Sequence, residues 1–512
     1  MLARAVTFAL VGLEPRRVEV EAHIQGSKVP SLTIVGLADR ACQEAKQRVR
    51  SGILSAELEW PGSRITVNLA PAELKKEGSG FDLPIALALL AASHQLPRAR
   101  LAEHASCGEL ALDGRLRRVG GVLAVAEGAR RAELERIICP YEACAEAALA
   151  GVEPVGVRHL ADAVAYLRGE LEPPEYVVGD GKPRRRPLDL ADVRGQERGR
   201  RALELAAAGR HNLLLGGPPG TGKTMLARRL PGILPPLEEE QALEVTRIHS
   251  VAGLVDPDHP LIGYAPFRAP HHSASTAAIV GGGPRLRPGE ASLAHRGVLL
   301  LDELAEFQRP ALEALRQPLE DGELVVARAA GSVRFPARFQ LIGTMNLCPC
   351  GARGDPGAQC SCSAQRLERY RDKLSRALLD RFDLVVTIPR ARALELQGGP
   401  GEASDLVRSR VVAARLRLAE AAPKRIAAAD ELLTRAVERL PLSGRGRAKV
   451  AGVSRTIAAL ADSMPSCRST LPRRSRIARR RSLRHHESLA QARTAAAAAR
   501  DPRSTGSALP AR

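Results

Sequence analysis

The chain has 512 residues, 45% of them apolar and 26% charged, a composition typical of a globular protein that is too long for one hydrophobic core. No apolar run approaches the roughly 18 residues that span a bilayer, and nine cysteines, an odd number, do not suit a secreted disulfide framework. We therefore expect a cytoplasmic protein without a membrane partner. The formal net charge of +19 suggests a polyanionic partner, but residues 464–512 carry +10 of that total.

The first predicted unit is an α/β domain over residues 1–168. Apolar and polar residues alternate in RVEVEAHI, which is typical of a half-buried strand. The apolar segment DLPIALALLAAS predicts a helix, and further strand-like and helix-like segments alternate around it. Residues 169–189 are rich in Pro, Gly and charge, which is typical of a linker between domains.

A second predicted α/β domain, residues 190–392, contains a phosphate-binding loop. The stretch LLLGGPPGTGKTMLARRL places an apolar strand before the pattern Gly-x-x-x-x-Gly-Lys-Thr and a helix after it. Glycines let backbone amides curl around phosphates, Lys223 would reach the β- and γ-phosphates, and the hydroxyl of Thr224 would bind Mg²⁺. The residues predicted to hold ATP in this loop are Gly217, Pro218, Pro219, Gly220, Thr221, Gly222, Lys223 and Thr224.

Two later strands of this domain would complete a site for ATP hydrolysis. GVLLLDELAEF ends a buried strand in Asp302, which would hold Mg²⁺ through water, and Glu303, which would polarise the attacking water. FQLIGTMN ends another strand in Asn346, which would sense the γ-phosphate and position the water. We therefore predict ATP and Mg²⁺ as the bound cofactors.

Four cysteines follow this last strand, in CPCGARGDPGAQCSC, as two Cys-x-Cys pairs. Four thiolates close together are typical of a structural Zn²⁺ site, although this spacing is tighter than the usual two to four residues. Buried free thiols in a glycine-rich loop are the alternative. The candidate zinc ligands are Cys348, Cys350, Cys360 and Cys362.

The C-terminal part of the sequence divides in two. Residues 393–463 are rich in Ala, Leu and Arg with helical periodicity, which predicts a small helical domain. Residues 464–512 hold twelve arginines, no lysine and few large apolar residues, which indicates either a disordered basic tail or a shift of the coding frame near Ser463. We favour the frameshift, in which case the helical domain is truncated and the charge of the tail has little functional weight.

The order of these motifs, with LLDRFDLVV after Asn346, resembles an AAA+ ATPase. The segments APFRAPHHSASTAAIVGGG and RPGEASLAHRGVLLLDEL resemble the magnesium-chelatase-like branch, and residues 1–463 together resemble the YifB/ComM family. The resemblance implies a Lon-protease-like α/β first domain, an AAA+ αβα domain and a helical C-terminal lid. It also implies a homo-hexameric ring that acts on single-stranded or branched DNA as a branch-migration helicase in recombination or natural transformation.

The resemblance also assigns two arginines to the nucleotide. Arg381 of LDRF would be the arginine finger that reaches a neighbouring subunit's γ-phosphate, and Arg445 of LSGRGRAKV would touch nucleotide from the lid of its own subunit. A finger supplied by a neighbour couples hydrolysis to assembly, so a ring is expected. His271 and His272 fall in a segment that faces the pore in the family, and we expect polar contact with a translocated polymer there, not a metal site.

A Lon-like first domain requires that a protease be considered. Alignment with the Lon nucleophile and lysine segments puts Gly80 and Leu123 at those two positions, and neither residue can perform the chemistry. A shifted register would leave Ser79 with Lys75 or Lys76 as a minor alternative. We expect a non-catalytic scaffold.

The leading hypothesis is thus an ATP-driven ring motor that acts on DNA. Aromatic residues make up 3% of the chain, so contacts with backbone phosphates would outweigh base stacking. The alternative is a chelatase-type motor subunit that drives insertion of Mg²⁺ into a porphyrin. A non-enzymatic DNA-binding protein is disfavoured because every hydrolytic position is filled.

Overall fold

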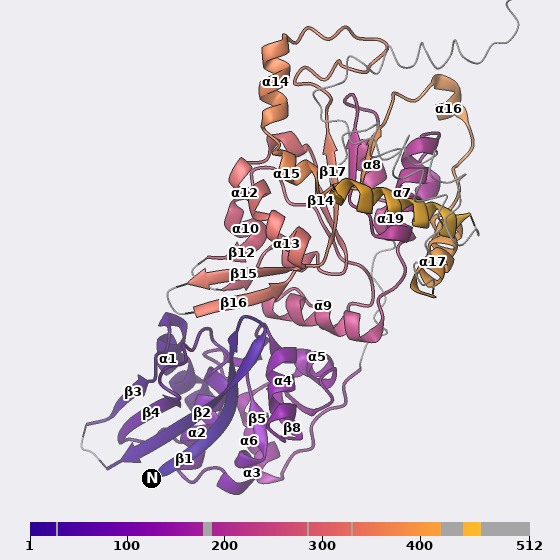
Figure 1. Ribbon diagram of the computed structural model, residues 1–512. Helices are drawn as coiled ribbons and strands as arrows, with labels where there is room; N and C mark the ends of the chain where they lie inside the picture. Colours follow the sequence, from indigo (N-terminus) through magenta and orange to yellow (C-terminus); the bar gives the residue numbers. More distant parts are fainter. Residues whose placement is uncertain (27–28, 178–186, 284–285, 329–330, 421–443, 462–512) are drawn as a thin grey trace, which may run out of the picture.

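The computed structural model describes the chain except for residues 27–28, 178–186, 284–285, 329–330, 421–443 and 462–512. Two units of mixed α/β structure follow one another, and helices come last (Figure 1). The predicted multidomain α/β organisation is therefore confirmed. The predicted tail, residues 464–512, lies outside the described residues, as does part of the predicted linker.

The N-terminal unit is built on a seven-stranded mixed sheet. Strands β1 and β2 form an antiparallel hairpin, and β1 pairs on its other side with β5 in parallel. Along β2, buried Val18, Val20 and Ala22 alternate with more exposed residues, as the sequence pattern predicts. In spatial order the strands are β3 (Ser31–Val35), β4 (Arg64–Ala70), β2 (Glu14–Gln25), β1 (Leu2–Val11), β5 (His104–Ser106), β8 (Arg136–Pro140) and β9 (Glu153–Val157).

Helices pack on this sheet and close its core. The apolar helix α2 (Asp82–Ala92) is buried along its whole length and packs on β1 and β2. Its one acidic residue, Asp82, is paired with Arg48 at 2.6 Å, because a buried carboxylate needs a partner. The other helices are α1 (Arg40–Ser55), α3 (Arg98–Ala102), α4 (Val122–Arg131), α5 (Cys144–Ala148) and α6 (Leu160–Arg168), and a small hairpin joins β6 (Glu109–Leu110) to β7 (Leu116–Arg117).

The second unit is built on a five-stranded sheet in which all neighbours are parallel. Strands β10, β14 and β17 are buried along their whole length, which explains their nearly continuous apolar sequences. Because the strands are parallel, their carboxyl ends meet at one edge. In spatial order the strands are β11 (Phe267–Arg268), β14 (Val298–Leu301), β17 (Gln340–Met345), β10 (Leu213–Gly216) and β18 (Leu384–Thr387).

Helices lie on both faces of this parallel sheet (Figure 1). They are α7 (Glu197–Gly209), α8 (Lys223–Ala227), α9 (Glu239–Ala252), α10 (Thr276–Val280), α11 (Glu290–Leu293), α12 (Arg309–Ala314), α13 (Arg316–Asp321), α14 (Ala364–Asp372) and α15 (Arg376–Leu379). Two hairpins interrupt the alternation, β12 (Gly281–Gly282) with β13 (Arg287–Pro288) and β15 (Glu323–Arg328) with β16 (Gly331–Pro336). The β15–β16 hairpin extends over the N-terminal unit.

The last described helices are α16 (Ala393–Gln397), α17 (Ser404–Glu420) and α19 (Gly444–Leu460). Helices α17 and α19 pack on each other and on α7. Val411 of α17 and Val453 of α19 belong to the same apolar cluster as Leu213 of β10. The predicted helical domain therefore shares a core with the parallel-sheet unit. No helix within the described ranges has the length and apolar character needed to cross a membrane.

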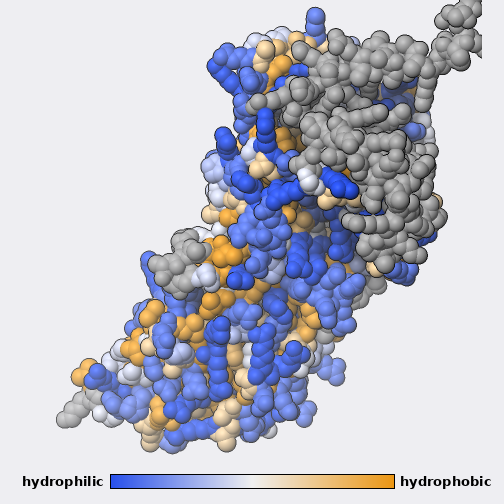
Figure 2. Space-filling model, viewed as in Figure 1, coloured by the Kyte–Doolittle hydropathy of each residue, from blue (hydrophilic) through white to orange (hydrophobic). Residues whose placement is uncertain are grey.

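The two α/β units are docked on one another. Helix α9 of the second unit packs on α4 of the first, and Arg247 pairs with Glu127 across this contact at 2.5 Å. An apolar cluster crosses the same boundary, with Leu13 from the N-terminal unit and Phe335 from β16. Elsewhere, the face shown in Figure 2 is largely hydrophilic, with smaller apolar patches.

Candidate nucleotide-binding site

The phosphate-binding loop joins β10 to α8 at the carboxyl edge of the parallel sheet. Strand β10 ends at Gly216 and α8 begins at Lys223, so the loop has a strand before it and a helix after it. Gly222 has φ of 84°, a left-handed conformation that favours glycine. A Cβ at Gly217 would collide with the backbone carbonyl of Ile388. The tight path of the loop therefore depends on both glycines.

Lys223 is folded back onto the loop that precedes it. Its Nζ donates to the carbonyl oxygen of Pro218 at 2.7 Å and to Oδ1 of Asn346 at 3.1 Å. Burial lowers the pKa of Lys223, while the nearby carboxylates of Asp302 and Glu303 oppose this effect. The ammonium group thus lies between the phosphate-binding loop and the end of β17, and it is next to two acidic residues.

Asp302 directly follows β14 and connects three segments of the site. Its Oδ1 accepts hydrogen bonds from the hydroxyl of Thr224 at 2.7 Å and from that of Thr344 at 2.6 Å. Hydroxyl and carboxylate oxygens are the hard ligands that Mg²⁺ prefers, and Mg²⁺ in proteins is commonly held by one or two such groups together with phosphates. Thr224 and Asp302 therefore fit a Mg²⁺ ion that arrives with a nucleotide.

Thr344, which the sequence reasoning missed, fixes the turn that carries both acidic residues. Besides donating to Asp302, its hydroxyl accepts from the backbone N–H of Glu303 at 3.0 Å. Glu303 is exposed, with φ of 55°. The signal in the sequence was a polar residue near the end of the mostly apolar segment FQLIGTMN, two positions before Asn346.

Asn346 follows β17 and faces the phosphate-binding loop. Its side-chain oxygen accepts from Lys223, and its backbone oxygen accepts from the hydroxyl of Tyr370 at 3.2 Å. The two contacts hold both the side chain and the main chain of Asn346 beside the loop.

Gln196, also missed from the sequence, supports the loop from behind. It precedes α7, it is 8% exposed, and it has φ of 52°. Its Nε2 donates to the carbonyl oxygens of Pro389 at 2.8 Å and of Thr221 at 3.3 Å. The buried amide therefore ties the phosphate-binding loop to the segment that follows β18.

Arg381 lies at the opposite edge of the sheet from the phosphate-binding loop. It precedes β18, whose first residue, Leu384, is paired with the first residue of β10, Leu213. The loop follows the last residue of β10, so about 10 Å of strand separates the two ends. The Arg381 side chain is 9% exposed and pairs with Glu320 of α13. Burial lowers the pKa of Arg381.

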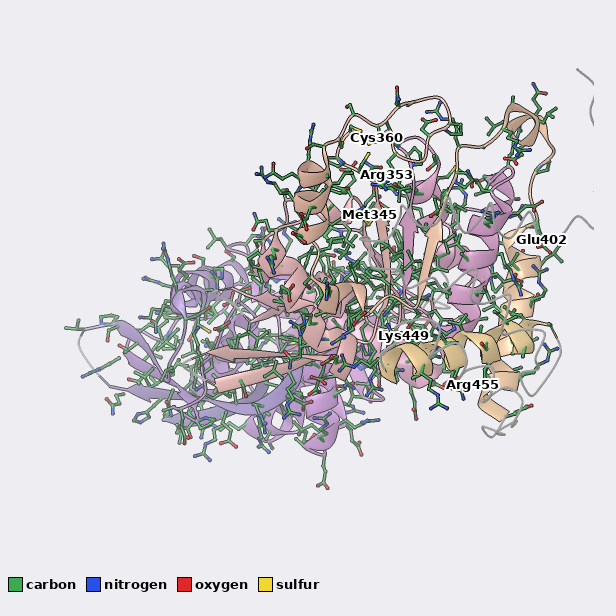
Figure 3. All side chains as sticks on the ribbon, turned by 45° about the horizontal axis from the view of Figure 1, so that its top comes forward. Met345, Arg353, Cys360, Glu402, Lys449 and Arg455 are labelled. Atoms are coloured by element: carbon green, nitrogen blue, oxygen red, sulfur yellow. The ribbon has the colours of Figure 1, made fainter. Side chains whose placement is uncertain are left out.

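Arg445 lies beside Arg381 and not beside the loop of its own chain. In the first turn of α19, its Nη2 is 3.1 Å from Oε1 of Glu320. One turn later, Nζ of Lys449 is 3.3 Å from the carbonyl oxygen of Phe382, just before β18. Figure 3 shows Lys449 well away from Met345 and Cys360, which lie toward the carboxyl edge. The predicted contact of Arg445 with nucleotide in its own subunit is therefore not favoured by its position.

The four predicted zinc ligands converge. All four sulfur atoms lie within 4.8 Å of one another, and Sγ of Cys360 is 3.7 Å from those of Cys348 and Cys350. Sulfurs around a tetrahedral Zn²⁺ with Zn–S bonds of about 2.3 Å would be about 3.8 Å apart. The backbone N–H of Arg353 also donates to Sγ of Cys348 at 3.3 Å, as it would to a thiolate. Since Cys350 is exposed, buried free thiols do not describe the cluster, and the donor set fits Zn²⁺.

The loop that carries the four cysteines, residues 348–362 (the cysteine loop), lies beside the phosphate-binding loop at the carboxyl edge of the sheet, which we call the nucleotide edge. It begins two residues after Asn346, and Figure 3 shows Arg353 and Cys360 beyond the end of β17. A Cβ at Gly351 would lie 3.0 Å from the side chain of Pro219, so the cysteine loop and the phosphate-binding loop touch.

The other candidate residues make different contacts. The hydroxyl of Ser79 donates to Glu109, Nζ of Lys76 donates to a backbone carbonyl, and Lys75 pairs with a neighbouring carboxylate at 2.5 Å, so none of these contacts is that of a Ser-Lys dyad. The rings of His271 and His272 lie 4.1 Å apart on an exposed segment. Within the described residues, only the four cysteines group three or more His, Cys, Asp or Glu side chains around a possible metal position.

Two family models match the chain. The model described as Magnesium chelatase, subunit ChlI, matches residues 189–396, the unit that contains the phosphate-binding loop. The model described as Subunit ChlI of Mg-chelatase matches residues 20–143, within the N-terminal unit.

Curated relatives cover most of the chain. The competence protein ComM of Haemophilus influenzae is 42% identical over 486 residues, 90% of this chain and 94% of that protein. The protein YifB of Salmonella typhimurium is 46% identical over 419 residues, 81% of this chain and 82% of that protein. The magnesium-chelatase 67 kDa subunit of Heliobacterium mobile is 29% identical over 292 residues, 44% of each chain. These matches confirm the resemblance seen in the motifs, and the chain belongs to the YifB/ComM family of magnesium-chelatase-like ATPases.

Proposed function

We propose that the protein hydrolyses ATP as a ring-shaped motor that acts on DNA. The observation that carries ATP hydrolysis is the hydrogen bond from Thr224 to Asp302, together with that from Lys223 to Asn346. These contacts join the phosphate-binding loop to the ends of β14 and β17. The nucleotide site therefore needs no large rearrangement to receive the phosphates of ATP.

Each side chain has one task in this proposal. Lys223 exchanges its carbonyl partners for oxygens of the β- and γ-phosphates. Thr224 and Asp302 would hold Mg²⁺, which would supply positive charge to neutralise the transferred phosphoryl group. Glu303 is exposed and can turn toward the attacking water, which it polarises, and Asn346 orients that water against the γ-phosphate.

The position of Arg381 supports a ring. At the amino edge of the sheet this side chain cannot serve the nucleotide of its own chain, so we propose that it completes the site of a neighbour in a homo-hexamer. Arg445 lies beside it and would reach the same neighbouring nucleotide. Residues 393–463 are, on this proposal, the helical lid of an AAA+ domain over residues 190–392.

DNA is the proposed partner. The ComM relative is named a competence protein, and residues 1–463 carry a formal charge of +9. With 3% aromatic residues, the grip would rest on backbone phosphates and weaken steeply with salt. We propose branch migration or translocation on single-stranded or branched DNA in the cytoplasm.

The N-terminal unit has a supporting part in this proposal. We assign residues 1–168 as a non-catalytic domain with a Lon-protease-like fold, joined to the motor by the linker 169–189. Its docking on α9 suits a scaffold that moves with the motor. We further propose a structural Zn²⁺ held by the four cysteines beside the nucleotide edge.

Steady-state ATP hydrolysis, measured with and without single-stranded and branched DNA, tests the proposed function. We expect DNA to stimulate hydrolysis and Lys223→Ala to abolish both the basal and the stimulated rate. Arg198→Ala, an exposed basic residue on α7, is the control and should behave as wild type. ATP hydrolysis that ignores every DNA would remove the DNA motor and leave an ATPase with another substrate.

A chelatase-type motor subunit is the second candidate, because both matching family models are named after magnesium chelatase. In that case, hydrolysis would respond to partner chelatase subunits and porphyrin, and DNA would have no effect. A coupled assay for insertion of Mg²⁺ into a porphyrin distinguishes the two functions.

A further inference from the structure

Two arginines from distant parts of the chain share one carboxylate. Arg381 precedes β18, Arg445 lies in the first turn of α19, and both pair with Oε1 of Glu320 in α13. The Glu320 side chain is 43% exposed, so its ion pairs are open to exchange with anions from solution. No sequence motif had marked Glu320 as functional.

The cluster can bind more negative charge than Glu320 supplies. Burial lowers the pKa of Arg381, and the charges of Arg445 and Arg316 lower it further, which places three guanidinium groups within mutual influence. Arg316 has its own partner, Glu313, at 3.1 Å. The Nε atom of Arg381 is buried and has no hydrogen-bond partner among the described residues. A buried donor without a partner in a cationic site suits an additional anionic ligand.

The place of the cluster excludes the nucleotide of the same chain. Glu320 lies two residues before Gly322, whose carbonyl accepts from Ala337 N–H just before β17 begins. Arg381 comes just before β18, so both segments lie at the amino edge of the sheet. The phosphate-binding loop is at the carboxyl edge. A nucleotide whose phosphate reaches these arginines must therefore be bound in the site of another protein molecule.

We propose that Glu320 is an exchangeable counter-ion, which holds Arg381 and Arg445 in the separate subunit and is displaced by the phosphate of a neighbouring subunit's nucleotide. This inference rests on the proposed ring ATPase. Carboxylates and phosphates present similar oxygen pairs to a guanidinium group, so exchange needs little movement of the arginines. The carboxylate of Glu320 thus competes with ring assembly. It neutralises the two arginines until a neighbouring subunit with bound nucleotide takes its place.

The test is Glu320→Gln, which keeps the size of the side chain and removes its charge. ATPase rate per subunit is measured across protein concentrations, and assembly with a non-hydrolysable ATP analogue is followed by sedimentation. We expect the concentration for half-maximal assembly and activity to fall by a factor of about two to five, the range that corresponds to an exposed ion pair. The rate at saturating concentration should stay within about twofold of wild type, since the arginines themselves are unchanged.

Two matched variants control this experiment. Glu320→Asp keeps the charge and should retain the wild-type concentration dependence. Glu153→Gln removes another exposed carboxylate that pairs with an arginine, Arg136 in the N-terminal unit, and should shift nothing. Thermal melting of all variants shows that they are folded.

Two results would overturn the inference. If Glu320→Gln and Arg381→Ala both lost activity at saturating protein concentration, the role of Glu320 would be to position the arginine and not to compete for it. If assembly and activity of Glu320→Gln depended on protein concentration as in the wild type, the carboxylate would have no part in assembly. Failure of the proposed function would give a different result. In that case wild-type chains would not assemble with the analogue, and no neighbouring phosphate would be present to displace Glu320.

Discussion

Asp302 and Glu303 show how one motif yields two unlike carboxylates. Asp302 is half-buried and accepts from Thr224 and Thr344, so its position is set before any metal binds. The next residue, Glu303, takes a left-handed conformation with φ of 55° and becomes exposed. The change of direction separates the two side chains, so one suits the metal and the other suits the attacking water.

Replacing Glu303 by Gln tests this division of roles. The amide keeps the shape but cannot take a proton, so hydrolysis should fall by about 10²-fold or more while ATP binding is retained. Fluorescent-nucleotide binding and steady-state turnover measure the two properties separately. Glu306→Gln is the matched control, because Glu306 is exposed and pairs with Lys373, and its turnover should be near wild type.

Thr344→Val removes the hydroxyl that joins β14 to β17 and keeps the side-chain shape. The carboxylate of Asp302 and the N–H of Glu303 both lose a partner, which should cost about 1–3 kcal/mol of stability. A higher Mg²⁺ requirement for hydrolysis should accompany this loss, as a Mg²⁺ titration of the rate would measure. Thr344→Ser restores the hydroxyl and should restore both properties, and a Ser variant as impaired as the Val variant would contradict the role of the hydrogen bonds.

Among the secondary-structure elements, β17 and its continuation do most to shape the site. The strand carries Thr344, its end carries Asn346, and the cysteine loop after it touches the phosphate-binding loop through Gly351 and Pro219. Because the four-cysteine loop begins two residues after Asn346, the fold of this loop and the position of Asn346 are linked.

Metal analysis of the purified chain tests the cysteine cluster. We expect about one zinc ion per chain, and Cys350→Ser should lower the content to near zero because a four-thiolate site needs every ligand. The melting temperature should fall in the same variant. Cys144→Ala, a buried thiol in the N-terminal unit, should leave the metal content unchanged. Full zinc occupancy in Cys350→Ser would exclude it as a ligand.

The contact between α9 and α11 contains a pH-dependent group. His249 is buried, and its Nε2 lies 3.0 Å from the backbone oxygen of Leu293. Burial lowers the pKa of His249 below the ordinary 6.5, with a smaller contribution from Arg268. The unfolded chain therefore takes up a proton near pH 6.5 that the folded chain takes up only at lower pH.

It follows that the contribution of His249 to the free energy of unfolding should be constant above about pH 6.5 and decrease as the pH falls below that value. His249→Gln should reduce this decrease, because Gln can donate to the same carbonyl without titrating. Urea unfolding at pH 7.5 and 5.5 measures the effect, with exposed His271→Gln as the control. An unchanged slope in His249→Gln would assign the acid sensitivity to other buried groups.

At the scale of the whole molecule, the docked N-terminal unit and the β15–β16 hairpin stand out. Phe335 of β16 is fully buried in a cluster that includes Leu13 of the other unit, and Arg247 pairs with Glu127 nearby. The hairpin therefore has one face on the N-terminal unit while its base adjoins β17. Any movement of the parallel-sheet unit would carry the N-terminal unit with it.

Phe335→Ala tests how far the two units depend on each other. Loss of the buried ring should cost about 3–5 kcal/mol and weaken the docking surface. We expect calorimetry to show two separated unfolding transitions where the wild type shows coupled unfolding. Val325→Ala, on the exposed side of the same hairpin, should change little. Unchanged cooperativity in Phe335→Ala would mean that the other contacts across the boundary, such as the hydrogen bond from Ser250 to Glu146, are enough to couple the units.

Local patterns were enough to predict the units and most of the nucleotide edge. The apolar runs before Gly217, Asp302 and Asn346 do become buried parallel strands. The end of the phosphate-binding loop meets Asp302 through Thr224 and meets Asn346 through Lys223, because parallel strands bring their carboxyl ends together. The roles of Gln196 and Thr344 could not be predicted from the sequence. A single polar side chain that is not part of a recurring motif does not indicate a function until its hydrogen-bond partners are known.

By itself, the sequence determined the family, the phosphate-binding loop and the acidic pair, because phosphate and metal chemistry demand fixed residue types at short spacings. Only the tertiary structure decided that Arg445 joins Arg381 and Glu320 at the amino edge, away from the loop of the same chain. It also brought the four sulfurs within bonding reach of one ion. The physical reason is that parallel strand register and helix packing, which no short segment encodes, set which edge of the sheet each distant residue occupies.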